Sequence, residues 1–328
     1  MLLELLFAIT LSLDTVITHP RMIAPKSVYI SPDGQTAYIN NLEGMNTLIY
    51  DVATRKVKGI IQHRGKPVES CFTRGGRYVW ISYYRLIGPG YPPCPEWRKY
   101  KTRSIVVVYD TLKEKIVKEI KVGVIPKIIR TSPDGRYVLV SNWNSHSVSV
   151  IDADSFRVVK EIRVGWVPRG ISFSLDSHYA YVVNMGGFTI SKIDLDSLRV
   201  VEVIKKGVGN RPRHIVTTPD SQYMLFSCHG DGHIRKLDLR ADSIVGKIKV
   251  GRQPRTIVLD PEGNYLFVVN YRSNSISVVD IKKMEVVAEA RAGIKPVGCD
   301  LTPDGKELWV TNYGSGSVYI YKIDYSKG

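Results

Sequence analysis

The sequence has little of the residues and patterns that would identify a function directly. Its four cysteines, Cys71, Cys94, Cys228 and Cys299, show no C-x-x-C spacing, which argues against a zinc site, a thioredoxin motif or a haem attachment site. No Gly-rich phosphate loop is present, and no Ser-His-Asp or Cys-His arrangement can be assembled from the sequence. We therefore predict no cofactor, and catalysis stays undecided.

Long apolar runs and helical patterns are missing as well. No run reaches the roughly 18 apolar residues of a membrane span, and no repeat unit has the 3.6-residue period of a helix. The apolar segment Leu2–Leu13 lacks a basic leader, contains Glu4 and has no clear cleavage site. From Phe7 onward it alternates with period two, so we expect a half-buried strand rather than a secretory signal.

The composition is that of a folded chain with many turns. The 328 residues are 44% hydrophobic and include 27 Gly and 17 Pro. Lys and Arg number 46 against 31 Asp and Glu, a net charge of +15. This surplus favours anionic partners such as nucleic acid, acidic glycans, lipid head groups or small acids. A basic protein with no specific anion partner is the alternative.

One proline recurs before a short apolar strand, at intervals of 42, 59, 42, 44, 42 and 42 residues: Pro25, Pro67, Pro126, Pro168, Pro212, Pro254 and Pro296. Each unit continues with a turn such as Ser-Pro-Asp-Gly (31–34 and 132–135), in which Pro presets φ and Gly accepts positive φ. Three further strands follow. Four short antiparallel strands in about 42 residues are typical of a propeller blade.

The seven prolines predict an all-β fold, a single seven-bladed β-propeller over residues 1–328, expected to be a monomer. After Asp324 the seventh blade lacks an outer strand, and the N-terminal segment before Ile23 can supply it. This closure would remove the open sheet edges that promote aggregation.

The unit resembles the YVTN-repeat, YncE-like propellers. The resemblance rests on Tyr-Val-Val-Asn (181–184), Phe-Val-Val-Asn (267–270), Trp-Val-Thr-Asn (309–312), Val-Ser-Val-Ile-Asp (148–152) and Ile-Ser-Val-Val-Asp (276–280). It covers essentially the whole chain. It implies a binding or scaffold protein, an extracytoplasmic setting (periplasmic, extracellular or envelope-associated) and DNA binding in some members, and related propellers include lactone hydrolases. A shared fold does not transfer a site.

Antiparallel geometry places the strand 2–3 loops and the links between blades on one face. That face should carry cations beside every repeat proline: Lys26, Lys66, Lys127, Arg169, Arg211, Arg213, Arg255 and Lys295. The opposite face should collect turn and strand-end carboxylates such as Asp33, Asp134, Asp51 and Asp152, whose expected role is to bond their own turn. The cations either face an anion or serve the repeat structurally.

Both departures from the repeat length fall on the cationic face. Blade two holds 17 extra residues, in an insertion at 84–101 that mixes aromatic and basic residues, among them Tyr91 and Trp97. Two extra residues lie in the link 205–210. Trp143, Tyr271 and Tyr313 follow the second strands and should rim the same face. Aromatic residues among cations suit stacking and phosphate neutralisation, although a plain exposed loop is the alternative.

One cluster could bind metal. His229 and His233 lie in a predicted strand 2–3 loop, with His146 as a further ligand on the same face. The spacing His-x-x-x-His places two ligands on one side of a helix, but it does not do so in a hairpin loop. We predict no metal. The leading hypothesis is a non-enzymatic binding or scaffold propeller engaging an anionic ligand or a partner protein. The alternative is a lactonase-like or metal-assisted hydrolase with a site at the mouth of the central channel.

Overall fold

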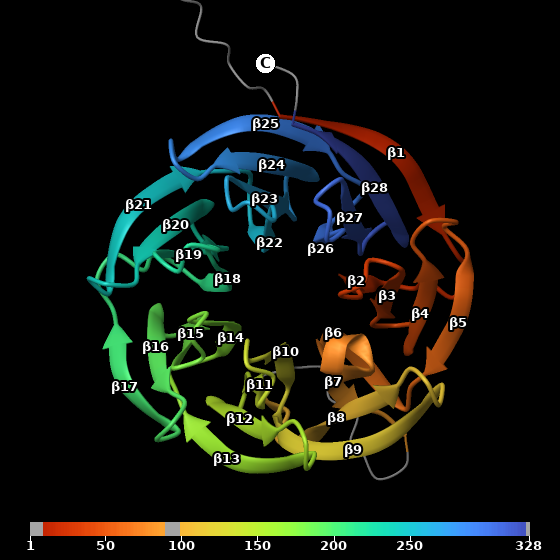
Figure 1. Cartoon of the computed structure of the whole chain (residues 1–328), viewed down its shortest axis with the longest axis horizontal. Coiled ribbons are helices and arrows are strands. Elements are labelled where there is room, and N and C mark those ends of the chain that lie inside the picture. The colour runs from red at the N-terminus through yellow and green to blue at the C-terminus, as the bar shows by residue number, and fades with distance from the viewer. Residues whose placement is uncertain (1–8, 89–98, 326–328) are drawn as a thin grey trace, which may run out of the picture.

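The computed structural model describes residues 9–88 and 99–325 and shows seven four-stranded antiparallel blades around a central axis (Figure 1). Blades one to three comprise β2 (Pro25–Ile30), β3 (Thr36–Asn41), β4 (Asn46–Asp51), β5 (Val57–Gln62); β6 (Gly65–Thr73), β7 (Tyr78–Leu86), β8 (Arg103–Asp110), β9 (Lys115–Val124); and β10 (Pro126–Thr131), β11 (Tyr137–Asn142), β12 (Ser147–Asp152), β13 (Arg157–Arg163). A short 3-10 turn, Arg74–Gly76, joins β6 to β7.

The remaining blades repeat this order. They comprise β14 (Pro168–Phe173), β15 (Tyr179–Asn184), β16 (Thr189–Asp194), β17 (Arg199–Ile204); β18 (Pro212–Thr217), β19 (Tyr223–Cys228), β20 (His233–Asp238), β21 (Ser243–Lys249); β22 (Pro254–Leu259), β23 (Tyr265–Asn270), β24 (Ser275–Asp280), β25 (Glu285–Arg291); and β26 (Pro296–Leu301), β27 (Glu307–Asn312), β28 (Ser317–Asp324) with β1 (Thr10–Thr18).

The predicted fold and its closure are confirmed. The seventh sheet has the order β1-β28-β27-β26, so the N-terminal strand is the outermost strand of the last blade. Thr10 pairs with Asp324 and Thr18 with Ser317. Among the described residues no helix has the length and hydropathy needed to cross a membrane.

Apolar side chains fill the spaces between neighbouring blades. The cluster between blades one and seven joins Ile39 and Leu48 to Trp309 and Val318, and it includes Ile17 of β1. Strands β3, β7, β11 and their equivalents are buried along most of their length, as expected for sheets covered on both faces. Outer strands such as β21 alternate between exposed and half-buried residues.

The residue before each repeat proline has an unusual backbone. In the described chain six of the seven have φ between 54° and 57°, including the β-branched Ile125 and Val167. Such values are rare for residues other than glycine. The carbonyl of this residue accepts a hydrogen bond from the amide that follows the second strand, as Ile125 does from Trp143 at 2.9 Å. The bond fixes where the next residue enters the innermost strand.

Candidate functional site

A group of cations lies at the mouth of the central channel, where the innermost strands begin. The residue directly after the repeat proline is a cation in five blades, and Val68 and Val297 take its place in blades two and seven. We call the five cations the channel cations: Lys26, Lys127, Arg169, Arg213 and Arg255. They stand on β2, β10, β14, β18 and β22, which surround the axis in Figure 1.

Serine residues of the preceding blade hold these positions in place. Ser82 donates a hydrogen bond to the carbonyl of Lys127 at 2.9 Å, and Ser141 donates one to the carbonyl of Arg169 at 2.7 Å. Ser227 does the same for Arg255 at 2.7 Å. Because these bonds use the backbone carbonyls, they leave the N–H donors of the cationic side chains unused.

A cavity of about 350 Å³ at this mouth brings side chains of five blades together. Lys26, Lys127 and Arg255 line it from blades one, three and six. Its aromatic lining is Tyr84, Tyr271 and Tyr313. The predicted combination of cations and aromatic residues therefore exists at the channel mouth.

The cations are short of acidic partners. Glu69 of β6 lies 3.2 Å from the ammonium group of Lys26, and both side chains are buried. Within the part of the chain that the structure describes, no acceptor lies within hydrogen-bonding distance of the charged groups of Lys127, Arg169 or Arg213, although these residues are only 7%, 4% and 7% exposed. Buried charges in proteins are normally paired, so this arrangement calls for a counter-ion.

Aromatic rings cover part of this charge. The ammonium of Lys127 lies 3.7 Å from the ring centre of Tyr84 and 4.5 Å from that of Trp143. The guanidinium of Arg255 lies 3.5 Å from the ring centre of Tyr271. Cation–π contacts contribute about 0.5 to 2 kcal/mol, which is far less than an opposite charge supplies in a buried setting.

Burial and mutual repulsion weaken the protonation of the lysines. Burial, followed by the nearby arginines, lowers the pKa of Lys26 to about 7 even though Glu69 acts in the opposite direction. Burial and the charges of Arg169 and Lys26 lower the pKa of Lys127 well below its usual value. These side chains therefore interact across the channel.

Below the channel cations a network of polar side chains crosses the axis. Arg130 of blade three donates to the hydroxyl of Tyr29 in blade one at 3.0 Å, and its other terminal nitrogen lies 3.1 Å from Nε2 of His214 in blade five. Tyr29 donates to Glu69 at 2.7 Å. We call these four residues the channel floor. Since Arg130 contacts two blades that are not its neighbours, it spans the channel.

The contacts of the channel floor determine the tautomer and the charge of the His214 ring. Arginine only donates hydrogen bonds, so Nε2 of His214 must accept, and the ring proton is on Nδ1. Nδ1 is buried and has no partner within the described residues. Burial and the charge of Arg130 lower the pKa of His214 well below its usual value, which keeps the ring neutral.

The three cations on the other side of the repeat proline have different surroundings. Arg211 and Lys295 are exposed and form an outer group. Lys66 lines the same cavity as Lys26 and Lys127, where it pairs with Glu43. In the sequence, cations before and after the repeat proline look equivalent. In the structure, the backbone conformation gives them different surroundings.

The insertion of blade two begins as an extension of strand. Tyr84 and Arg85 belong to β7, which continues to Leu86 and pairs there with Gly65. Tyr84 stacks over the channel cation Lys127. The predicted ligand-binding residues Tyr91 and Trp97 lie outside the described residues, as does Cys94.

The candidate metal ligands have other contacts. His146 stacks on Trp166, with ring centres 5.6 Å apart, and its Nδ1 accepts from the amide of Val167. Nδ1 of His233 lies 2.9 Å from the carbonyl oxygen of Asp231. Burial lowers the pKa of His229 to about 3. The described residues include no group of three or more His, Cys, Asp or Glu side chains arranged to hold a metal ion.

The turn and strand-end aspartates serve their turns, as predicted. Asp33 accepts from the amide of Gln35 and Asp134 from that of Arg136, each at 3.0 Å. Asp51 and Asp152 accept from the amides of Thr54 and Ser155, both at 2.8 Å. The carboxylates of this face are therefore used to shape the backbone.

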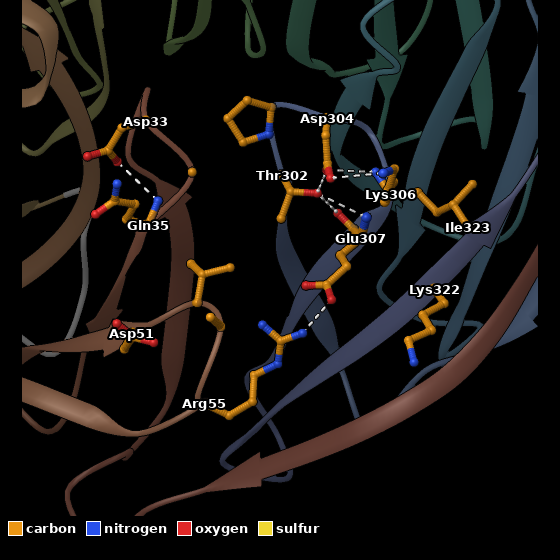
Figure 2. A pocket seen from close by; sticks show the side chains of 14 residues that line it. Asp33, Gln35, Asp51, Arg55, Thr302, Asp304, Lys306, Glu307, Lys322 and Ile323 are labelled. Atoms are coloured by element: carbon orange, nitrogen blue, oxygen red, sulfur yellow. Dashed lines mark hydrogen bonds and ion pairs between the residues drawn. The ribbon is translucent and has the colours of Figure 1, made fainter.

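A larger cavity, of about 840 Å³, lies between blades one and seven on the face of these turns. Figure 2 shows that charged side chains of this cavity have partners: Arg55 forms an ion pair with Glu307, and Asp304 accepts from the hydroxyl of Thr302 and the amide of Lys306. Arg55 also lies over the ring of Trp309. These contacts support the closure of the ring, so we place the candidate site at the channel mouth.

Sequence reasoning did not find Glu69, Tyr29, Arg130 or His214. They occupy the second or fourth position after a repeat proline, where most other blades have apolar or small residues such as Ile128 and blade seven has Asp300. A polar residue on an innermost strand was the available signal. Its partner could not be inferred, because it comes from across the channel.

Comparisons with known proteins support the architecture. Residues 154–291 match the family model described as Lactonase, 7-bladed beta-propeller, and residues 102–168 match Cytochrome D1 heme domain. A segment of 119 residues is 26% identical to Antigen Lp49 of Leptospira interrogans serogroup Icterohaemorrhagiae serovar copenhageni (strain Fiocruz L1-130) and covers 36% of this chain and 25% of that protein. A chain of Kuenenia stuttgartiensis hydrazine synthase superimposes with a TM-score of 0.79 over 93% of this chain and 97% of its own, at 22% identity.

These likenesses are to propellers and to parts of propellers. Each family model covers less than half of this chain, and the segment shared with the Leptospira antigen is about a quarter of that protein. The structural match is at an identity that shows the fold alone. The resemblance to YVTN repeats in particular stays a prediction.

Proposed function

We propose that this propeller is a binding protein that holds an anionic ligand at the cationic, aromatic-rimmed mouth of its central channel. The observation that supports this most directly is the burial of Lys127, Arg169 and Arg213 without an acidic partner among the described residues. A bound anion would supply the missing charge. The anion is free, or it is a group carried by a polymer or a partner protein.

The energetics favour such a ligand. Taking a cation out of water costs several kcal/mol, and a nearby opposite charge offsets that cost. Among the described residues, Glu69 is the one carboxylate that forms an ion pair with any of the five channel cations, so most of the cost is not offset within the protein. The rim cations Arg211 and Lys295 are exposed and would guide anions toward the mouth.

The hydrolase alternative has weaker support. A general base in the channel would need an available carboxylate or imidazole. Glu69 accepts from Tyr29 and pairs with Lys26, and Asp300 accepts from the amide of Ile30 at 2.8 Å. The described carboxylates of the channel are therefore engaged in structural bonds. An envelope or extracellular location also stays a prediction.

The test is a comparison of two triple variants in binding to heparin and polyphosphate. Arg169→Met, Arg213→Met and Arg255→Met together remove three channel cations but keep the length of the side chains. The matched control, Arg136→Met, Arg240→Met and Lys306→Met, removes the same charge from the opposite face. We expect binding to fall at least tenfold in the first variant alone, with unchanged circular dichroism. Equal binding by both variants would show that the proposal is wrong.

A further inference from the structure

The channel is closed a short distance below its cations. The channel floor residues Tyr29 and Arg130 stand three positions after the channel cations of the same strands, a rise of about 10 Å. Hydrogen bonds join them to Glu69 and His214, so side chains of blades one, two, three and five meet across the axis. A chain of linked monomers cannot pass through such a floor.

The mouth therefore has the shape of a cup with a limited volume. The cavity measures about 350 Å³, and its lining includes Tyr84, Tyr271 and Tyr313 together with the ion pair of Lys66 and Glu43. The guanidinium group of Arg255 lies over the ring of Tyr271. A ligand has to fit between these rings and above the floor.

The donors favour a compact group with several oxygens. Arg169, Arg213 and Arg255 come from three successive blades, and each guanidinium presents up to five N–H donors. Lys127 approaches from blade three. A single carboxylate offers two oxygens in one plane, whereas a phosphate group offers three or four in a tetrahedral array and two negative charges. Arginine is the side chain that best matches phosphate.

Resting on the proposed function, we infer that the cup binds one phosphate group, either inorganic phosphate or the phosphate of a small monoester. Lys127 and Arg255 of the cavity lining hold its oxygens, and the tyrosine rim accepts the organic part of an ester. Arg169 and Arg213 lie outside this lining and add the positive charge of the neighbouring blades. The carboxylate of Glu69 pairs with Lys26 and keeps that ammonium group oriented. Longer anions reach this site only through a terminal phosphate.

The experiment is calorimetric titration of the full chain with inorganic phosphate, phenyl phosphate and malonate, with heparin as the polymer. We expect phosphate to bind with 1:1 stoichiometry and to lose at least tenfold in affinity in the double variant Arg169→Met, Arg213→Met. The variant Arg136→Met, Arg240→Met of the opposite face should bind as the native protein does. Tighter binding of phenyl phosphate than of phosphate would identify the monoester as the ligand source.

Three outcomes would contradict the inference. If heparin binds at the channel cations but phosphate and phenyl phosphate do not, the cup does not recognise phosphate and only the proposed function stands. If malonate binds more tightly than either phosphate compound, the ligand class is a dicarboxylate. If neither heparin nor any small anion binds, both proposals are wrong. Near-native unfolding midpoints of the variants would show that lost binding is not lost folding.

Discussion

At the scale of single residues, the direction of the channel cations depends on the backbone of their neighbours. The residue before the proline adopts positive φ in six blades, and its carbonyl accepts a hydrogen bond from the residue that follows the second strand. The carbonyl of the cation itself bonds a serine of the preceding blade, as in Arg169 with Ser141. Both bonds are made by main-chain atoms, so the side chains are placed without losing their own donors.

Lys26 should make anion binding depend on pH. Burial and neighbouring arginines lower its pKa to about 7, and a bound anion would raise it. Binding then takes up a proton, so affinity should fall several-fold between pH 6 and pH 8.5. Sulfate is a suitable probe because its own charge is constant over this range. The variant Lys26→Met should show a smaller slope than the native protein, with Lys127, whose pKa is also lowered, supplying what remains. A native profile without slope would contradict the assignment.

Asp300 should lower stability as the pH rises. Its burial raises the pKa to about 6 from an ordinary value near 4. A raised pKa in the folded state contributes stability below the unfolded-state pKa, and that contribution is lost as the pH rises through about 6. Asp300→Asn keeps an acceptor for the amide of Ile30. The free energy of unfolding of the variant minus that of the native protein should increase by on the order of 2 kcal/mol between pH 4 and pH 7. Urea unfolding at both pH values measures this difference.

At the scale of strands, the closure of the ring depends on one face of β1. Ile17 is buried in the cluster between blades one and seven, whereas its neighbour Val16 is 48% exposed. Adjacent residues of a strand point to opposite faces. The outermost strand of blade seven is thus packed against the protein through a few inward-facing side chains.

Ile17→Ala should destabilise the protein by about 2 to 4 kcal/mol, because it leaves a cavity in that cluster. Val16→Ala removes a similar group from the surface and should change stability by less than about 0.5 kcal/mol. Chemical denaturation of both variants provides the comparison. Similar losses in the two would mean that β1 is not held by this cluster.

At the scale of the whole molecule, the uncompensated channel charge should oppose folding. An unpaired buried cation has a desolvation cost that no partner offsets, and an apolar side chain of similar volume does not have that cost. Without ligand, Arg169→Met should therefore raise the free energy of unfolding by about 1 kcal/mol. With saturating phosphate the order should reverse, because ligand stabilises only the protein that binds it. Thermal unfolding of both proteins with and without phosphate checks this, and a loss of stability in the variant without ligand would contradict it.

The overall fold could be predicted from the sequence because it repeats. The prolines and turn motifs recur every 42 residues in most units, and each recurrence supports the others, so blade number and closure followed. The site repeats only in part. Lys127 and Arg211 stand equally close to a proline, yet one is buried and the other exposed, since positive φ turns the preceding residue outward. Arg130 and His214 have no equivalents in the other blades. Their contact joins blades three and five across the channel, so it forms only when the ring is complete.

Val68 and Val297 occupy the same backbone position as the channel cations. The blades thus accept an uncharged side chain at this point as readily as a charged one. In either case a hydroxyl of the preceding blade donates to the main-chain carbonyl, as Ser27 does to Val68 and Thr256 to Val297. Ligand preference is for that reason separable from folding in this ring. The position after the repeat proline is equivalent in all seven blades. Substitutions there, one blade at a time, should change the selectivity of the ring toward neutral or cationic ligands.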